Sequence, residues 1–345
     1  MTSGILGYGT YVPKYRIALT TIAKIWQKAP EEVAALGITE KAVSAFDEDA
    51  ITMAYEASSK ALQMAGINPT KIDSVVMGSE SHPYAVTPSA TILGEYLGVG
   101  NNYFAADFTF ACKAATAAMF ATCGMIDAKQ IQYGLVVGSD AAQAKPKDIL
   151  EYTAGSGASA FLIGTKKTEI VATILATTSY SSFTPDFWRR EHVRYPSHHG
   201  RFTGEPSYFT HVMQCAKSLV EKSKSKPADF DYCVFHMPNG KFPRAVAKRL
   251  GFTEEQLAPS LTVDKIGNSY SATAMLGLSA VLDIAKAGQK IFFVSYGSGA
   301  GSDGFIFETT PNLIKKRKCT VPVMEQIRSN EQLSYSEYLK NIHIL

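Results

Sequence analysis

The sequence lacks the features that mark several classes of protein. Its 345 residues include five cysteines, an odd number without a C-x-x-C pair, which argues against a disulfide framework, a zinc ribbon and a redox dithiol. The N-terminus has neither the basic start nor the apolar run of a signal peptide. No apolar run reaches the roughly 18 residues that a bilayer requires. We therefore predict a cytoplasmic protein with reduced thiols and no membrane association.

An excess of charge of one sign is also missing. Lys and Arg number 34 and Asp and Glu number 31, which gives a formal net charge of +3. A nucleic-acid binder carries a strongly basic face, so nucleic acid is not an expected partner. The short basic run at 315–318 is interpreted as a solvated or subunit-facing stretch. The four histidines within 192–211 fit no standard zinc spacing, and no metal site is predicted.

The sequence does contain short β-rich runs that alternate with helical stretches of small residues. Strands are predicted at 74–78, 134–138 and 291–295. An amphipathic helix is predicted at 50–65, ended by Gly66. This alternation is typical of an α/β protein whose sheet is covered by helices.

The second half of the chain resembles the first. Three pairs of segments correspond, at offsets of 158, 156 and 158 residues: 72–76 with 230–234, 111–120 with 267–277, and 138–140 with 296–298. Similarity at a fixed period indicates a repeated architecture. The alternative is chance, because helices of small residues resemble one another.

This repeat suggests two similar α/β halves, which we place at 1–165 and 166–345. Two segments interrupt it. Residues 179–211 are polar, aromatic and His-rich, and are predicted to form an insertion over one face of the core. Residues 315–345 form a charged C-terminal extension.

One cysteine has a distinctive setting. Cys112 follows a predicted strand at 103–108 and directly precedes a predicted helix of small residues at 114–123. A thiol at a helix N-terminus meets unpaired N–H groups and the positive end of the dipole, which favour the thiolate. Cys112 is therefore predicted to be a nucleophile, the alternative being an ordinary buried cysteine. The other four cysteines are expected to serve in packing.

Four further polar residues follow predicted strands or occupy equivalent positions in the repeat. Glu80 and His236 come after equivalent strands, Asn268 lies opposite Cys112 in the repeat, and Ser298 lies in a glycine-rich turn. The carboxyl ends of strands in an α/β sheet converge on its ligand crevice. These side chains are therefore predicted to meet Cys112 in one site.

These motifs together resemble the thiolase superfamily. They are Cys112 before its helix, His-x-Pro-x-x-Lys at 236–241, Gly-Asn-Ser at 267–269 and Tyr-Gly-Ser-Gly at 296–299. The resemblance implies a thiolase-like fold, a duplicated five-layer αβαβα architecture. Within the superfamily, Gly-Ser-Glu-Ser at 78–81 and Phe-Ala-Cys at 110–112 look like the hydroxymethylglutaryl-CoA (HMG-CoA) synthases, and the chain length looks like their archaeal branch.

The resemblance implies an activity. Acetyl-CoA, acetoacetyl-CoA and water would give 3-hydroxy-3-methylglutaryl-CoA and CoA, in the mevalonate route to isoprenoids. Cys112 would carry the acetyl group, Glu80 would remove a proton from its methyl, and His236 would donate to the ketone oxygen of acetoacetyl-CoA. Because that methyl is a weak acid, we expect Glu80 to be poorly solvated, with a raised pKa.

Further residues are expected to bind the substrates. Asn268 and Ser298 are expected to bind substrate, with Asn268 and backbone amides near Cys112 and Ser298 as donors to the oxyanion and carbonyl groups. By resemblance, Thr153 and Thr203 would contact the acyl portion and Ala29 would line the CoA tunnel. The CoA phosphates would be bound by basic residues near His236 or in the insertion: Lys241, Arg244 and Arg201.

The resemblance also implies partners. CoA thioesters are substrates, and no further cofactor is expected. A homodimer is expected, as is association with an acetoacetyl-CoA thiolase and a small acyl-CoA-binding protein.

Two alternatives remain open at the level of sequence. A type III ketoacyl synthase shares the Cys, His and Asn set but makes its carbanion by losing carbon dioxide, so it needs no base such as Glu80. A non-catalytic CoA-binding scaffold would not need Cys112, Glu80, His236 and Asn268 together. A thiolase would have a second catalytic cysteine where this chain has Ser298.

Overall fold

The computed structural model describes residues 3–345, apart from the side chain of Arg201. Nine strands are hydrogen-bonded in the order β11-β12-β13-β8-β1-β7-β6-β4-β5. The first-half strands are β1 (Gly4–Tyr11), β4 (Ser74–Gly78), β5 (Phe104–Phe108), β6 (Tyr133–Asp140) and β7 (Gly157–Gly164). The second-half strands are β8 (Ala172–Ser181), β11 (Tyr232–Phe235), β12 (Lys290–Val294) and β13 (Gly301–Thr309).

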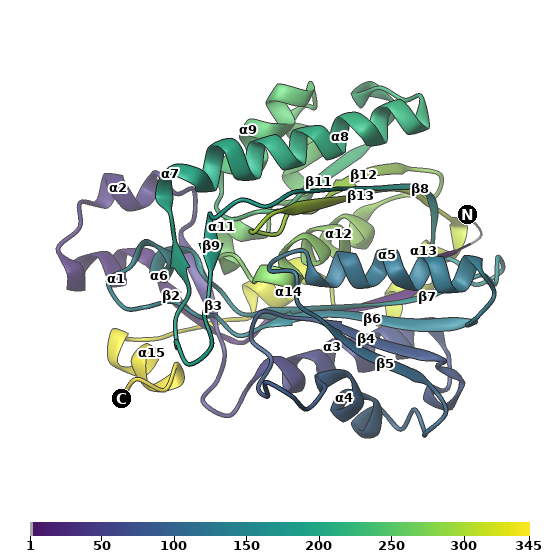
Figure 1. The fold of residues 1–345 in the computed structure, drawn as a ribbon, viewed down its shortest axis with the longest axis horizontal. Helices are drawn as coiled ribbons and strands as arrows, with labels where there is room; N and C mark the ends of the chain where they lie inside the picture. The colour runs from purple at the N-terminus through teal and green to yellow at the C-terminus, as the bar shows by residue number, and fades with distance from the viewer. Residues whose placement is uncertain (1–2) are drawn as a thin grey trace.

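The two sets of strands are stacked and meet at one side, where β1 and β8 pair over two residues each. Figure 1 shows helices α5 (Ala114–Asp127) and α12 (Thr273–Ile284) between them. Helices α3 (Ala50–Ala65) and α4 (Ser89–Leu97) cover the outer face of one set. Helices α8 (Phe209–Ser223) and α9 (Lys241–Leu250) cover the outer face of the other. The five-layer αβαβα architecture is confirmed.

Smaller elements surround one end of these layers. A second sheet is formed by β2 (Tyr15–Ala18), β3 (Glu40–Val43) and β14 (Glu331–Gln332). A two-stranded ribbon is formed by β9 (Phe187–Trp188) and β10 (Ser197–His198). The short helices are α1 (Leu19–Trp26), α2 (Pro30–Ala34), α6 (Ile149–Thr153), α7 (Gly200–Phe202), α10 (Glu254–Leu257), α11 (Val263–Ile266), α13 (Pro311–Lys316), α14 (Val323–Arg328) and α15 (Tyr335–Asn341).

Local sequence explains why the main elements begin and end where they do. Asp49 caps α3 by accepting from the backbone N–H groups of Ile51 and Thr52, and Gly66 ends the helix in the left-handed region. The predicted bounds of α3 and β4 agree with the structure. The predicted helix at 114–123 is longer, since α5 continues to Asp127.

Small residues bring α5 close to β4. A Cβ on Gly78 of β4 would lie 2.2 Å from the backbone nitrogen of Ala115, so only glycine permits this approach. Ala114, Ala115 and Ala118 are fully buried on the facing side of α5. The start of α5, and with it Cys112, is thereby held inside the molecule.

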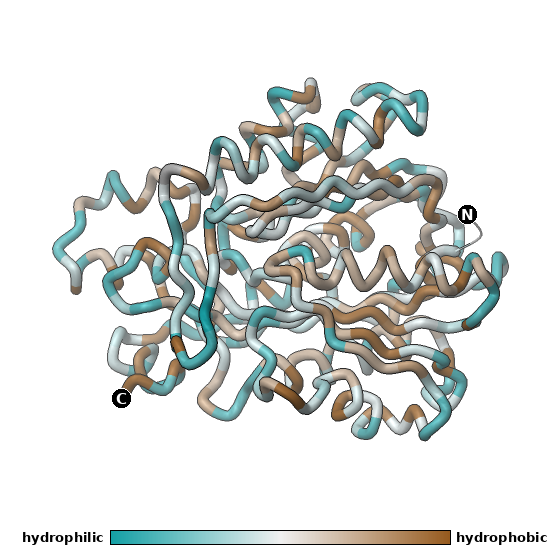
Figure 2. The backbone as a smooth tube through the Cα atoms, viewed as in Figure 1, coloured by the Kyte–Doolittle hydropathy of each residue, from teal (hydrophilic) through white to brown (hydrophobic). Residues whose placement is uncertain are grey.

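The apolar core follows the layers. Figure 2 shows apolar residues concentrated along the strands and hydrophilic residues on the outer loops and helix faces. All five cysteines are free, four of them buried. Cys319 is exposed, so the prediction that it packs in the core is wrong: it lies in a short 3₁₀ turn after α13. Within residues 3–345, no helix is both long enough and apolar enough to cross a membrane.

Candidate active site

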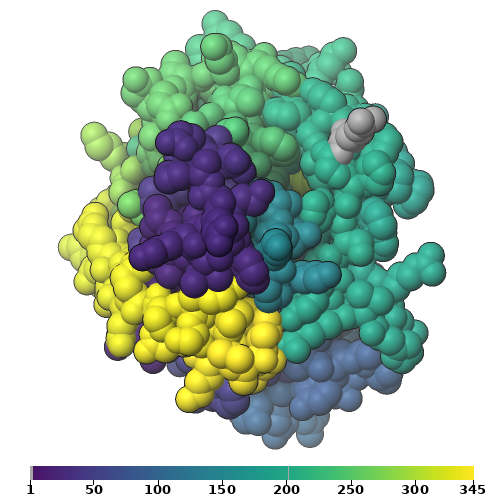
Figure 3. Space-filling model, turned by 90° about the vertical axis from the view of Figure 1, so that its left-hand side faces the viewer, coloured from purple at the N-terminus to yellow at the C-terminus, as the bar shows by residue number. Residues whose placement is uncertain are grey.

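A cavity of about 290 Å³ opens where the two halves meet. Six residues singled out from the sequence line it: Cys112, Thr153, Thr203, His236, Asn268 and Ser298. In Figure 3 the surface is hollowed between the purple α1–α2 segment and the teal chain beside it. Leu36, from the turn that follows α2, and Phe187, from the teal chain, both line the cavity.

Cys112 lines this cavity and lies immediately before Lys113, the N-cap residue of α5. Its sulfur lies 3.0 Å from Oε1 of Glu80. Burial and the neighbouring Glu80 carboxylate raise the pKa of the Cys112 thiol well above its usual range, while the Asn268 amide opposes this rise. The expectation of a thiolate favoured by the helix N-terminus is therefore wrong, because burial and the neighbouring carboxylate disfavour the charged form of the thiol.

Glu80 lies in the loop that follows β4. Burial, and to a lesser degree the nearby Asp140 carboxylate, raise its pKa from 4.5 to about 8. The raised pKa expected from the sequence is present. The Cys112 thiol donates to Oε1 of Glu80. Because the pKa of the thiol is raised as well, Glu80 is the first of the two groups to lose its proton as the pH rises, and it does so near pH 8.

Asp140, which the sequence analysis did not select, holds the Glu80 loop. Its Oδ1 accepts from the backbone N–H of Glu80 at 2.7 Å and from the hydroxyls of Ser79 and Ser81 at 2.8 and 2.7 Å. Its Oδ2 accepts from the N–H and hydroxyl of Ser271 at 2.9 and 2.6 Å. One buried carboxylate thus joins loops from both halves. The sequence feature that could have identified Asp140 is the presence of an acidic residue at the end of a strand.

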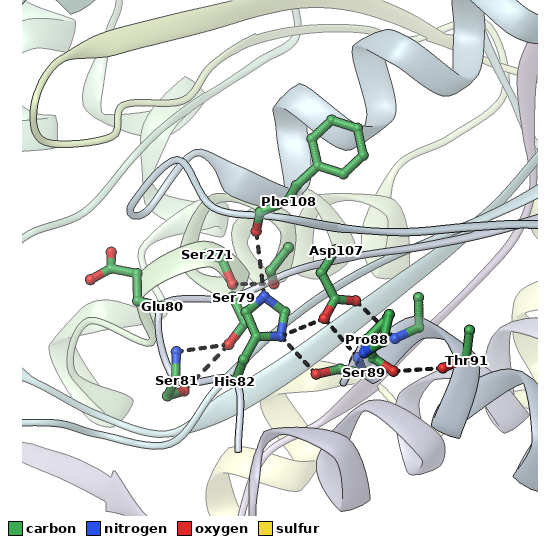
Figure 4. A network of polar contacts seen from close by, with 12 residues as sticks. Ser79, Glu80, Ser81, His82, Pro88, Ser89, Thr91, Asp107, Phe108 and Ser271 are labelled. Atoms are coloured by element: carbon green, nitrogen blue, oxygen red, sulfur yellow. Dashed lines mark hydrogen bonds and ion pairs between the residues drawn. The ribbon is translucent and has the colours of Figure 1, made fainter. Parts of the chain in front are cut away.

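A second network fixes the other side of this loop (Figure 4). Nδ1 of His82 lies 2.8 Å from the hydroxyl of Ser89 and 3.3 Å from Oδ2 of Asp107. Asp107, on β5, also accepts from the backbone N–H groups of Ser89 and Ala90 at the start of α4. The Glu80 side chain points away from this network. The loop is therefore held on both sides while its carboxylate remains available to Cys112.

His236 follows β11 and is almost fully buried. Burial lowers its pKa from 6.5 to about 3, so the imidazole is neutral. Its carbonyl accepts from the Tyr208 hydroxyl at 2.6 Å, and its Nδ1 has no hydrogen-bond partner among the described residues. A neutral imidazole in the cavity wall donates a hydrogen bond rather than a proton.

Asn268 is oriented by its own loop. Its Oδ1 accepts from the N–H of Tyr270 at 3.0 Å and from the hydroxyl of Thr273 at 2.7 Å. With the oxygen engaged, the amide nitrogen is the group directed to the Cys112 sulfur, which it stabilises in the charged form. The predicted carbonyl donor therefore lies beside the nucleophile.

Asp186 was also missed by the sequence analysis. It is fully buried, lines the cavity and accepts from the Tyr296 hydroxyl at 2.6 Å and from the N–H of Gly299 at 2.8 Å. These bonds hold the turn that contains Ser298 against the segment between β8 and β9. Nothing in the local sequence of that segment distinguishes Asp186 from an exposed acid.

The remaining predicted ligands lie outside the cavity lining. Ala29 is exposed at the start of α2, and Lys241 is exposed at the start of α9. Arg244 is engaged by carboxylates, with Nη2 2.6 Å from Oδ2 of Asp264, and this contact raises its pKa. The Arg201 side chain lies outside the described residues.

The histidines at 192–211 do not converge. His198 lines the cavity and contacts Asp148, whereas His211 is buried against Ser182 and His192 is exposed. Within the part of the chain that the structure describes, no three His, Cys, Asp or Glu side chains are placed to hold a metal ion.

Comparison with known proteins identifies the family. The chain is 51% identical over 339 residues to the hydroxymethylglutaryl-CoA synthase of Archaeoglobus fulgidus, and 49% identical over 339 residues to that of Methanocaldococcus jannaschii. Both alignments cover 98% of this chain and 98% of the relative. The chain belongs to the hydroxymethylglutaryl-CoA synthase family. It is therefore an acyl-transferring condensing enzyme, and the archaeal resemblance is confirmed.

Two further comparisons agree with this HMG-CoA synthase assignment. The family model described as 3-oxoacyl-[acyl-carrier-protein] synthase III C terminal matches residues 220–309. A crystal structure of an HMG-CoA synthase complexed with CoA has a TM-score of 0.89 at 22% identity, covering 99% of this chain and 90% of that chain. The 3-oxoacyl-[acyl-carrier-protein] synthase III of Aquifex aeolicus has a TM-score of 0.81 at 21% identity, covering 89% and 99%. These structures share the thiolase-like fold.

Proposed function

We propose that this chain condenses acetyl-CoA with acetoacetyl-CoA and water to give 3-hydroxy-3-methylglutaryl-CoA and CoA, in the mevalonate route to isoprenoids. The observation that supports this best is the contact between Glu80 and Cys112, since Cys112 lines the same cavity as neutral His236. Glu80 itself lines a neighbouring cavity, and Phe187 lines both. A nucleophile, a base of raised pKa and a neutral hydrogen-bond donor are the three groups that this condensation requires.

The first step is acetyl transfer. The Cys112 sulfur attacks the thioester carbonyl of acetyl-CoA while Glu80 accepts the thiol proton. The carbon–sulfur bond to CoA then breaks, and Glu80 returns the proton to the departing CoA thiolate. Asn268 donates to the developing oxyanion. The products are acetyl-Cys112 and CoA, and Glu80 is again a carboxylate.

The second step forms the new carbon–carbon bond. Glu80 removes a proton from the acetyl methyl, and the resulting enolate adds to the ketone carbon of acetoacetyl-CoA. His236 donates a hydrogen bond to the ketone oxygen as charge develops there, and the alkoxide takes the proton from Glu80. Water then cleaves the Cys112 thioester, which restores the thiol and releases the product.

The main alternative is a decarboxylating condensation of the type III ketoacyl synthase kind. The family model that matches residues 220–309 and the Aquifex aeolicus structure are consistent with its fold. Such an enzyme has no need for a buried carboxylate in contact with the nucleophile. Glu80 is therefore the residue that favours the non-decarboxylating reaction. A non-catalytic scaffold has no need for any of the contacts at Cys112.

The substrate and subunit contacts are also proposed. Thr153, Thr203 and Ser298, in the cavity wall, would contact the acyl portions, and the exposed Lys241 would bind a CoA phosphate. A homodimer is supported by β5, which stands at the edge of the main sheet and leaves Phe104 half exposed. Such an edge can extend across a two-fold axis.

Three other expectations remain proposals that follow from the sequence and its resemblance. They are a complex with an acetoacetyl-CoA thiolase and a small acyl-CoA-binding protein, a cytoplasmic location, and a division of the chain into halves at 1–165 and 166–345. The curacin HMG synthase has been solved in complex with a holo donor acyl carrier protein, so a fold of this kind accepts a protein partner.

Intact-mass analysis tests the proposed reaction. Acetyl-CoA alone should add one acetyl group to the protein, and later addition of acetoacetyl-CoA should remove it with release of 3-hydroxy-3-methylglutaryl-CoA. Malonyl-CoA should not replace acetyl-CoA as the source of the carbanion. Condensation that requires malonyl-CoA would support the ketoacyl synthase alternative, and the absence of any acyl adduct would support a scaffold.

A further inference from the structure

The C-terminal helix α15 packs against the structure that supports the cavity. Its Tyr338 is buried in an apolar cluster that also contains Tyr152 of α6 and Met237, the residue after His236. Figure 3 shows the yellow C-terminal residues directly against the purple α1–α2 segment, on the face that contains the hollow. A segment that interrupts the internal repeat thus lies next to the cavity wall.

Polar contacts connect α15 to α6. Glu151 of α6 is fully buried, and its carboxylate accepts from Tyr335 Oη of α15 at 2.8 Å and from Trp26 Nε1 at 2.9 Å. The backbone N–H of Lys147 donates to the same carboxylate at 2.6 Å. Nζ of Lys41 donates to the carbonyl of Glu151 and to Tyr338 Oη of α15. Helix α15 therefore supplies a donor to Glu151 and an acceptor to the lysine that binds its carbonyl.

Helix α6 needs this external support. It has five residues, and a helix so short is not stable without tertiary contacts. Leu150 and Thr153, on either side of Glu151, both line the cavity. The position of these two side chains therefore depends on how Glu151 is held from the side facing away from the substrate.

A second contact joins α15 to the ribbon formed by β9 and β10. Arg194, between β9 and β10, donates to the carbonyls of Ile342 and His343 at 2.9 and 2.8 Å, where the C-terminal helix ends. A cation is favourable at a helix C-terminus. Phe187 of β9 and His198 of β10 line the cavity. Helix α15 thus contacts two segments that carry cavity-lining residues, α6 and the β9–β10 ribbon.

We propose that Tyr335 and Glu151 are positioning residues for the substrate cavity, through which the C-terminal helix α15 sets α6 against the bound thioester. The proposal rests on the proposed function, since it takes the cavity as the site of acyl-CoA binding. Leu150 and Thr153 contact substrate before and during reaction, so their displacement weakens binding more than turnover.

Tyr335→Phe removes one donor from Glu151 and keeps the aromatic ring. It should raise KM for acetoacetyl-CoA by roughly tenfold and leave kcat within about twofold of the wild type. Tyr8→Phe is the matched control, because Tyr8 donates to Oδ1 of Asp283 at 2.7 Å in a buried site away from the cavity. Both variants lose one tyrosine–carboxylate bond, but only Tyr335→Phe should change KM.

Trp26→Phe provides an independent test if Tyr335→Phe folds poorly. It removes another donor from the same carboxylate, from a different helix, and should raise KM in the same way. The dissociation constant of acetoacetyl-CoA on a Cys112→Ala background should increase in parallel. This binding measurement does not require turnover, so it distinguishes a failure of the inference from a failure of the proposed reaction.

An unchanged KM and dissociation constant in both variants would show that α15 stabilises the fold without positioning the cavity. An equal rise in KM in the Tyr8→Phe control would show that general destabilisation is the cause. Either result overturns the proposal.

Discussion

Nζ of Lys113 lies 2.8 Å from Oδ1 of Asp303, and both side chains are almost completely buried. Lys113 directly follows the nucleophile, whereas Asp303 lies on β13 of the other half. The hydroxyls of Ser179 and Thr116 complete the surroundings of the Asp303 carboxylate, at 2.7 and 2.9 Å. One ion pair therefore joins the residue after Cys112 to the second set of strands.

We expect Lys113→Met to destabilise the protein by about 3–5 kcal/mol, because the Asp303 charge is then left buried without its counter-ion. Denaturant unfolding measures this change. The double variant Lys113→Met with Asp303→Asn should recover a large part of the loss, since it removes the unpaired charge. If the losses of unfolding free energy measured for Lys113→Met alone and Asp303→Asn alone simply add in the double variant, the two residues are not coupled. The contact would then not join the halves.

Cys112→Ala should abolish acetylation and turnover while leaving the unfolding transition near that of the wild type. The thiol donates to Glu80 and lies beside the Asn268 amide, and removing it leaves Glu80 in a site that already favours the neutral acid. Intact mass after acetyl-CoA treatment checks the prediction, and circular dichroism serves as the control for folding. Acetylation that persists in this variant would move the nucleophile elsewhere.

Glu80→Gln should reduce condensation by about 10²–10⁴-fold. Acetylation should be slowed less, because a thiol is far more acidic than an acetyl methyl. Single-turnover acetylation and steady-state condensation separate the two steps. Equal losses in both steps would contradict a separate role for Glu80 in forming the enolate.

The condensation rate should rise with pH and level off above about 8, because Glu80 acts as a base only when it is ionised. The free energy of unfolding should change in the opposite direction and fall as the pH rises. The folded protein holds the Glu80 proton from the normal carboxyl range up to about pH 8, so this group stabilises the fold at low pH and the stabilisation is lost across that interval. Glu80→Gln should remove that dependence from the unfolding free energy.

His236→Ala and Lys241→Ala should change different kinetic parameters. His236 is proposed to donate where negative charge develops, so its loss should lower condensation turnover while acetylation of Cys112 is better preserved. Lys241 is exposed and proposed to bind a CoA phosphate, so its loss should mainly raise KM, by an amount that added salt reduces. Equal loss of acetylation in both variants, with no recovery at saturating substrate, would indicate that this loop is structural.

Lys41 should make the free energy of unfolding depend on pH in the alkaline range. Burial lowers its pKa from 10.5 to about 7, with the Glu151 carbonyl and the Tyr338 hydroxyl as its contacts. Between about pH 7 and the unfolded pKa the unfolded chain binds more protons, so the unfolding free energy should rise with pH. Lys41→Met should remove this rise, whereas Lys24→Met, at an exposed position of α1, should retain it. An unchanged slope in Lys41→Met would contradict the prediction.

The sequence by itself was sufficient for features that depend on neighbouring residues. The apolar spacing of α3 and the glycine at position 66 predicted the bounds of that helix. The small residues after Cys112 predict a helix that packs closely against the sheet, as α5 does. The motifs around Cys112 and His236 were sufficient to indicate the fold and the family, because backbone propensity and short motifs are local properties of the chain.

Tertiary structure decided the electrostatics and the supports of the site. The helix N-terminus alone predicted a thiolate at Cys112, but burial and a carboxylate 32 positions earlier raise its pKa instead. The sequence predicted that Arg244 binds a CoA phosphate, whereas in the structure its guanidinium forms an ion pair with Asp264. Asp140 and Asp186 were not distinguished from exposed acids, because burial and hydrogen-bond partners arise only when distant segments pack. A residue's charge depends on the groups that surround it in space, and most of those groups are far away along the chain.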